Sequence, residues 1–170
     1  MIKTIFEEFM SMKLDTRTIG LDKSDCEDYF CVPIGAKVFA GLGVDGVQFC
    51  FIDGFNEMVF AISPEAIENK FVNPIAENFE IFLRLVVSCK NANPLEQIYW
   101  NTREEFISFL EEDMKNASAE QTAVLGQLQS ELNISPMTDP YAYVKELQRG
   151  FDYSRIKYSD EFYDVTGLPQ

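Results

Sequence analysis

The chain has 170 residues, with 28 acidic against 14 basic residues, no histidine and a formal net charge of −14. A charge of this sign disfavours binding to nucleic acid through phosphate contacts. The missing histidines exclude Ser-His-Asp and Cys-His catalysis, and any zinc or haem site that needs a histidine ligand.

The length fits one domain, which we place at residues 1–170. The first ten residues put Glu7 and Glu8 where a signal peptide needs its apolar stretch. No apolar run approaches the ~18 residues of a membrane span. We therefore expect a cytoplasmic protein that has no membrane partner.

The cysteines show no metal-binding or redox spacing. There are four, and none forms a C-x-x-C pair: Cys26, Cys31, Cys50 and Cys89. Spacings of this kind disfavour zinc ribbons and thioredoxin-type chemistry. We expect these side chains to behave as small buried apolar groups, and we expect no cofactor.

The first half of the chain predicts one helix and a small sheet. Residues 2–13 carry apolar side chains at helical spacing, which indicates an amphipathic helix. Residues 14–36 are mixed and partly acidic, and predict a loop with room for one short strand. Three β-branched and aromatic runs within 37–62 are separated by turn-rich segments, so they predict a three-stranded antiparallel meander. Both alternating faces of residues 47–52 are largely apolar, so this middle strand should be covered on both sides.

The second half predicts helices. Asn73 before Pro74 is typical of a helix start and, with the apolar spacing that follows, predicts a helix over 74–89. Four more helix starts are predicted: Asn93-Pro94, Thr102-x-x-Glu105, Ser118-x-x-Gln121 and Asp139-Pro140. The tyrosine-rich tail after Phe151 reads as strand or irregular chain.

This order of elements predicts an α+β fold, in which an antiparallel meander is flanked by helices. We expect a core over 1–90 and a helical extension over 91–170.

Several motifs that could carry chemistry have a simpler structural interpretation. The acidic runs 25–28 and 111–113 could bind a hard cation through oxygen ligands, but neither has the spacing of a calcium loop, and solvated faces explain them better. The letters G-x-G-x-x-G occur at 41–46, but between two predicted strands and without the following helix that a pyrophosphate site requires. We interpret them as hairpin residues. A nucleophilic Cys31 or Cys50 would lack an activating base.

The predicted turns of the meander are the best candidates for a binding surface. Phe55 lies in the turn Asp53–Glu57, where it either packs against a neighbouring helix or anchors a partner. If the protein is a binder, the partner-binding residues that we select are Asp45, Asp53, Phe55 and Glu57. We select no catalytic or metal-binding residue.

The sequence also resembles a known family. Residues 43–64, followed by Ile75, Ala76, Phe79, Phe82 and Leu83, are similar to the SUKH superfamily, which includes yeast cell-wall-assembly regulators and many small bacterial proteins. The resemblance covers about residues 1–90, and 135–148 resembles a helical extension in a bacterial branch. It implies an α+β fold and a binding role, because many bacterial members are regarded as immunity proteins that neutralise toxin domains, often nucleases. The family's proline and asparagine-glycine turn are not evident in 14–36, so no ligand-contact residue is carried over.

Three functions follow as expectations. The first is a non-catalytic, cytoplasmic protein-binding module of the immunity type, whose acidity would steer it toward a basic toxin or nuclease domain. The second is a scaffold or regulator unrelated to toxins, by analogy with the yeast members. The third is a metal-dependent enzyme that uses carboxylates. The oligomeric state stays open.

Overall fold

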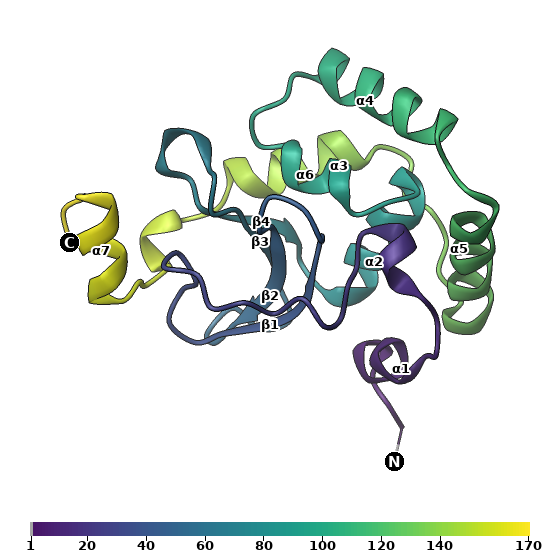
Figure 1. The fold of residues 1–170 in the computed structure, drawn as a ribbon, viewed down its shortest axis with the longest axis horizontal. Coiled ribbons are helices and arrows are strands. Elements are labelled where there is room, and N and C mark those ends of the chain that lie inside the picture. The colour runs from purple at the N-terminus through teal and green to yellow at the C-terminus, as the bar shows by residue number, and fades with distance from the viewer. Residues whose placement is uncertain (1) are drawn as a thin grey trace.

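The computed structural model describes residues 2–170 and is built around one antiparallel sheet (Figure 1). The strands follow one another in the order β1-β2-β3-β4, as β1 (Ala36–Gly41), β2 (Gln48–Ile52), β3 (Val59–Ile62) and β4 (Val72–Ala76). Every neighbouring pair is antiparallel. The predicted α+β meander is therefore confirmed, with one strand more than the sequence indicated.

Helices flank this sheet. In the described chain they are α1 (Ile5–Ser11), α2 (Phe79–Cys89), α3 (Asn93–Gln97), α4 (Arg103–Lys115), α5 (Ala119–Leu132), α6 (Pro140–Arg149) and α7 (Asp160–Thr166). Three short 3₁₀ helices accompany them: η1 (Thr16–Ile19), η2 (Ile67–Asn69) and η3 (Tyr153–Arg155). Within residues 2–170, no helix combines the length and the apolar character that crossing a bilayer requires.

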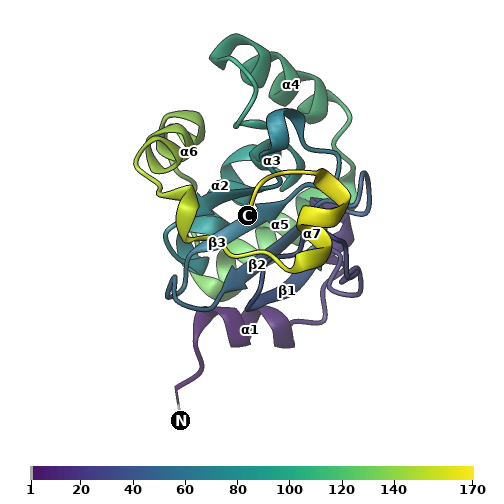
Figure 2. The same ribbon diagram turned by 90° about the vertical axis from the view of Figure 1, so that its left-hand side faces the viewer.

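Both faces of the sheet are buried. On one side α1, α2 and α5 pack over Phe49 and Phe51 of β2, and on the other side the chain after α6, with α7, covers Cys50 and Ile52 (Figures 1 and 2). This confirms that the middle strand is covered on both faces. The segment 91–170 supplies apolar side chains to both clusters, so it packs directly against the core.

A bulge shapes the edge strand β1. The register shifts between Val38 and Ala40, so Phe39 is an extra residue in the ladder with β2. A bulge of this kind turns two consecutive side chains toward one side. Phe39 and Ala40 accordingly both join the cluster under α1 and α2.

The predicted helix over 74–89 is wrong in its first turn. Residues Val72–Ala76 form β4, all of them buried, and Asn78 is the actual N-cap of α2, accepting a hydrogen bond from the Ile81 N–H at 2.9 Å. Proline is tolerated on an edge strand or at a bulge. Pro74 meets both conditions, because β4 is an edge strand and its register with β3 shifts between Val59 and Phe60.

All four later helices are present, but the starts of two of them differ in detail from the prediction. The capping box of Thr102 and Glu105 is present as predicted, and Asp139 caps α6. Ser118 caps α5, but the Gln121 side chain donates instead to the Lys90 carbonyl at 2.7 Å, which joins α5 to the end of α2. α3 starts at Asn93 itself rather than after it.

The tail differs from its prediction at one point. Irregular chain and η3 lead from Phe151 to Ser159, but residues 160–166 form α7. A stack of Tyr158 on Phe162, with ring centroids 3.8 Å apart, fixes this helix against the sheet face.

The position of the α2 N-cap can be tested by substituting Asn78, because the direction of the stability change depends on where the helix begins. Asn78→Ala should lower the free energy of unfolding by about 1 kcal/mol, because it removes the oxygen that caps α2. Asn78→Ser should stay close to wild type, since serine caps equally well. If the helix instead began at residue 74, Asn78 would be an interior position and alanine would stabilise the protein. Urea denaturation of the three proteins distinguishes the two cases.

Candidate functional site

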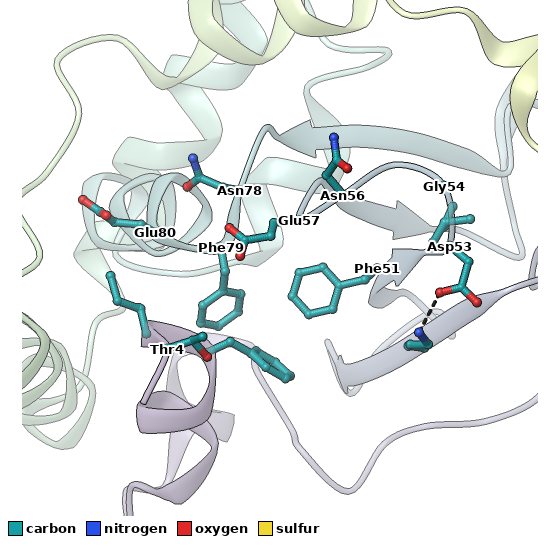
Figure 3. A pocket seen from close by; sticks show the side chains of 13 residues that line it. Thr4, Phe51, Asp53, Gly54, Asn56, Glu57, Asn78, Phe79 and Glu80 are labelled. Carbon is teal, nitrogen blue, oxygen red and sulfur yellow. Dashed lines mark hydrogen bonds and ion pairs between the residues drawn. The ribbon is translucent and has the colours of Figure 1, made fainter. Parts of the chain in front are cut away.

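A groove lies at the end of the sheet where β2 turns into β3 (Figure 3), with a volume of about 580 Å³. The start of α1, the β2–β3 turn and the start of α2 meet here. The residues that characterise it, which we call the sheet-end groove, are Phe6, Phe51, Asp53, Glu57, Phe79 and Glu80. It is a concave surface of a size typical of ligand sites.

The floor of the sheet-end groove is aromatic. The Phe6 ring contacts those of Phe51 and Phe79 edge-on, with centroids 5.0 Å apart in each case. Such edge-to-face pairs are favourable beyond the area they bury. Phe6 and Phe51 are only half-buried. The groove therefore exposes apolar ring surface, and the packing beneath it fixes its shape.

The rim of the groove is acidic. Asp53, Glu57 and Glu80 are exposed, and Asp53 and Glu80 lie toward opposite ends of the groove with the rings of Phe51 and Phe79 between them (Figure 3). Lys37 offsets part of this charge, because its Nζ lies 2.6 Å from Asp53 Oδ1. Both side chains of that pair are largely exposed, so the pair stabilises the fold little. An aromatic floor under a net negative rim suits a ligand that is both apolar and basic.

The structure separates the four residues selected from the sequence. Asp53 and Glu57 line the sheet-end groove, whereas Asp45 lies on the β1–β2 hairpin and lines a different cavity. The cause is the meander itself, because consecutive hairpins of antiparallel strands lie at opposite ends of a sheet. The four residues therefore form no single surface.

Phe55 takes the packed alternative of the two that the sequence left open. Its side chain is only 7% exposed. The ring packs edge-on against Phe60 of β3, with centroids 5.2 Å apart, and in a tilted arrangement against Phe151 just after α6, at 5.6 Å. The Arg155 guanidinium lies 4.4 Å from the ring centroid. Phe55 therefore joins the C-terminal segment to the sheet and offers no ring to a partner.

The cavity that contains Asp45 is the second candidate site. Its volume is about 190 Å³, and we call it the Glu96 cavity after its most buried charged residue. Its lining residues are Asp45, Val47, Ser63, Glu65, Glu96, Gln97 and Trp100. It lies between the β1–β2 hairpin, the end of β3 and α3.

Glu96 is in an unusual position for a carboxylate. It is 7% exposed, and its Oε1 accepts a hydrogen bond from Ser63 Oγ at 2.9 Å. Burial raises the pKa of Glu96 to about 7; the hydrogen bond from Ser63 opposes this shift, and the nearby charge of Asp45 adds to it. The Glu96 side chain therefore changes between its neutral and its charged form near neutral pH, and carboxylates at functional sites often have pKa values raised in this way.

Two of the motifs singled out in the sequence, the acidic run 25–28 and the glycines of 41–46, contribute to the structure of the β1–β2 hairpin. Asp25 Oδ2 accepts the Gly43 N–H at 3.2 Å and holds the β1–β2 hairpin, and it approaches Gly41 too closely for any side chain there. Gly43 has a φ of +83°, which a glycine adopts without strain. The hairpin interpretation of the 41–46 glycines is thus confirmed. Within residues 2–170, no three acidic or cysteine side chains are grouped to hold a metal ion.

Sequence reasoning missed the aromatic floor of the groove and Glu96. Phe6 and Phe79 belong to amphipathic helices, and periodicity does not distinguish a fully buried position from one at the rim of a groove. Glu96 carries a weak signal, because it lies among Pro94, Leu95 and Ile98, all buried. An acidic residue that is buried together with such apolar neighbours is unusual.

Comparisons with known proteins found no protein-family model, no curated protein and no solved structure that matches this chain.

The packing of Phe55 predicts a large loss of stability on truncation. Phe55→Ala should lower the free energy of unfolding by about 3 kcal/mol, because it removes a buried ring between two others. Glu57→Ala, two residues away and exposed, should change it by less than about 0.5 kcal/mol. A Phe55→Ala protein as stable as wild type in urea denaturation would show that the ring is not packed as described.

The raised pKa of Glu96 predicts that the free energy of unfolding falls as pH rises. Because its folded-state pKa is raised from 4.5 to about 7, the folded chain holds the proton more tightly than the unfolded chain does. The stability from this group is complete below about pH 4.5 and is lost as pH rises through about 7, by roughly 3 kcal/mol at about 1.4 kcal/mol per pKa unit.

Urea denaturation between about pH 5 and about pH 8 measures this loss. Glu96→Gln should abolish it, whereas Glu111→Gln, which removes an exposed carboxylate on α4, should retain it because Glu96 is still present. Equal pH profiles for wild type and Glu96→Gln would contradict the prediction.

Proposed function

We propose that this chain is a non-catalytic protein-binding module of the cytoplasm, whose sheet-end groove accepts a basic, apolar segment of a protein partner. The observation that carries the proposal is the combination of an aromatic floor, formed by Phe6, Phe51 and Phe79, with a rim of exposed carboxylates. Aromatic surface in a concave site is typical of the centre of an interface, and charge at its edge is typical of the rim.

The charge of the whole chain supports the same partner. A net charge of −14 attracts basic proteins at long range and raises their rate of encounter. Asp53, Glu57 and Glu80 then act at short range, where an arginine or lysine of the partner pairs with the rim. Both steps depend on ionic strength, so binding should weaken as salt is added.

Three of the four thiols are buried as the sequence predicted, whereas Cys26 is exposed, so the prediction is wrong for that residue. The buried thiols support a binding role over a catalytic one. Burial raises the pKa of Cys31 to about 11 and that of Cys89 to about 12, and it raises the pKa of Cys50 further still. Thiols with raised pKa values are protonated at neutral pH and are poor nucleophiles. Partial burial also raises the pKa of the exposed Cys26, and the charges of Asp25 and Asp22 add to that shift.

The resemblance to the SUKH superfamily makes an immunity protein the most specific form of this proposal. A toxin domain that acts on nucleic acid needs a basic surface, and an acidic module with an aromatic groove is suited to cover it. In that form, the partner would be encoded beside this chain, as a secreted protein with a toxin domain at its C-terminus.

The test is a pull-down from the native host with two charge-matched variants. Wild type should capture a basic protein, and capture should fall at least tenfold for the double variant Glu57→Gln with Glu80→Gln. The control is Glu111→Gln with Glu112→Gln on α4, which removes the same charge away from the groove and should capture the partner as wild type does.

The outcomes separate the proposal from its alternatives. Equal loss in both double variants would show that only net charge matters, and an acidic partner would contradict the proposal. A captured nuclease whose activity is suppressed by the chain identifies the immunity function. A captured protein without toxin activity identifies a scaffold or regulator instead.

A further inference from the structure

The Glu96 cavity lies at the other end of the sheet from the groove and has a different chemical character. Three of its lining residues are carboxylic acids, Asp45, Glu65 and Glu96, and among the described lining residues there is no lysine or arginine. No basic side chain among these described lining residues balances their negative charge. A cavity of this kind favours a positively charged occupant.

Glu96 has one carboxylate oxygen available. Oε1 accepts the hydrogen bond from Ser63 Oγ, and no other described residue donates a hydrogen bond to the Glu96 carboxylate. Acidic side chains are rarely buried to this degree unless they are paired. Glu96 lines the cavity, so its second oxygen can accept a hydrogen bond from an occupant, which would also be a counter-ion for the charged form of the carboxylate.

Trp100 adds an aromatic ring to the same lining. It is the only tryptophan of the chain and is half-buried. An indole ring is the strongest of the aromatic side chains in attracting a cation. A buried carboxylate and an indole together are the groups by which proteins bind organic cations.

Size and geometry narrow the class of cation. The cavity volume of about 190 Å³ is below the roughly 300–1,000 Å³ of sites for drug-sized ligands, so the occupant is a small group. Within residues 2–170 no three acidic or cysteine side chains are close enough to share a metal ion. A guanidinium binds best to two free carboxylate oxygens, whereas Ser63 already occupies one oxygen of Glu96, so a single ammonium fits better.

We infer that the Glu96 cavity is a binding site for a primary alkylammonium group, with Glu96 as its counter-ion and Trp100 as its aromatic wall. A free alkylamine and the lysine side chain of a protein present the same chemistry. The site is separate from the sheet-end groove and does not depend on the function proposed for it.

The single tryptophan provides the measurement. Titration of the full chain with n-butylammonium chloride at about pH 8 should give a saturable change in Trp100 fluorescence, while sodium chloride at equal ionic strength should not. Glu96→Gln, which keeps the acceptor for Ser63 but removes the charge, should weaken binding at least tenfold. The matched control Glu111→Gln should bind as wild type does.

Three results would overturn the inference. The first is a fluorescence response that does not saturate, the second is equal affinity in wild type and Glu96→Gln, and the third is a saturable response to magnesium chloride but none to n-butylammonium. The groove variant Glu57→Gln with Glu80→Gln should bind n-butylammonium as wild type does. Failure of this site is therefore distinguishable from failure of the proposed function.

The source of the ammonium group is found by comparing two probes. If the cavity receives a lysine side chain, Nα-acetyl-lysine amide should bind about tenfold more tightly than n-butylammonium, because its amide N–H groups can donate to Asp45 and Glu65, the exposed acids of the lining. If the ligand is a free amine, n-butylammonium should bind at least as tightly. Either order of affinities supports an ammonium site. If neither probe binds, the inference is overturned.

Discussion

The structure depends on a sheet whose two faces are both apolar. In β2, Phe49 and Phe51 face one side and Cys50 and Ile52 face the other, and all four side chains join hydrophobic clusters. Antiparallel sheets commonly leave one face to water, and this one does not. It therefore needs two covers. The second cover comes from the end of the chain, whose Ile156 and Phe162 pack on the face that the helices α1, α2 and α5 leave open.

Covering both faces leaves the ends of the sheet as the places where function can be located. The turns of a meander alternate between these ends, and each end recruits an element from outside the sheet: α1 and α2 beside the β2–β3 turn, and α3 beside the β1–β2 hairpin. Loops held by a rigid scaffold are where binding residues usually lie. The same packing that fixes the fold thus separates two acidic sites of different size, one open with an aromatic floor and one small with a buried carboxylate.

Local sequence patterns predicted the structure correctly where a single kind of interaction determines it. The apolar alternation of β2 predicted a strand covered on both sides, and the spacing of Thr102 and Glu105 predicted a capping box; both are confirmed. Pro74 shows where such patterns fail, because proline suits both a helix start and an edge strand. Contact with β3 and with α6, whose Gln148 donates to the Pro74 carbonyl at 3.2 Å, decides for the strand.

The candidate sites were harder to predict because they depend on contacts between distant residues. Phe55 has the sequence context of an exposed turn, yet Phe151, nearly a hundred positions later, buries it. The floor of the groove combines Phe6, Phe51 and Phe79 from three elements. Asp45 and Asp53 each lie in a predicted turn, and the antiparallel course of the strands places these turns at opposite ends of the sheet.

Glu96 is a side chain that changes charge near neutral pH in a protein without histidine. Histidine is the side chain that normally changes charge near neutral pH, and this chain has none. Burial brings Glu96 into that range instead, with a pKa of about 7. Since the charged form of Glu96 is unfavourable without a counter-ion, a cation in the cavity and the loss of a proton favour each other. An ammonium ligand would thus be held more tightly as pH rises through 7, and its binding would return the stability that ionisation of Glu96 removes.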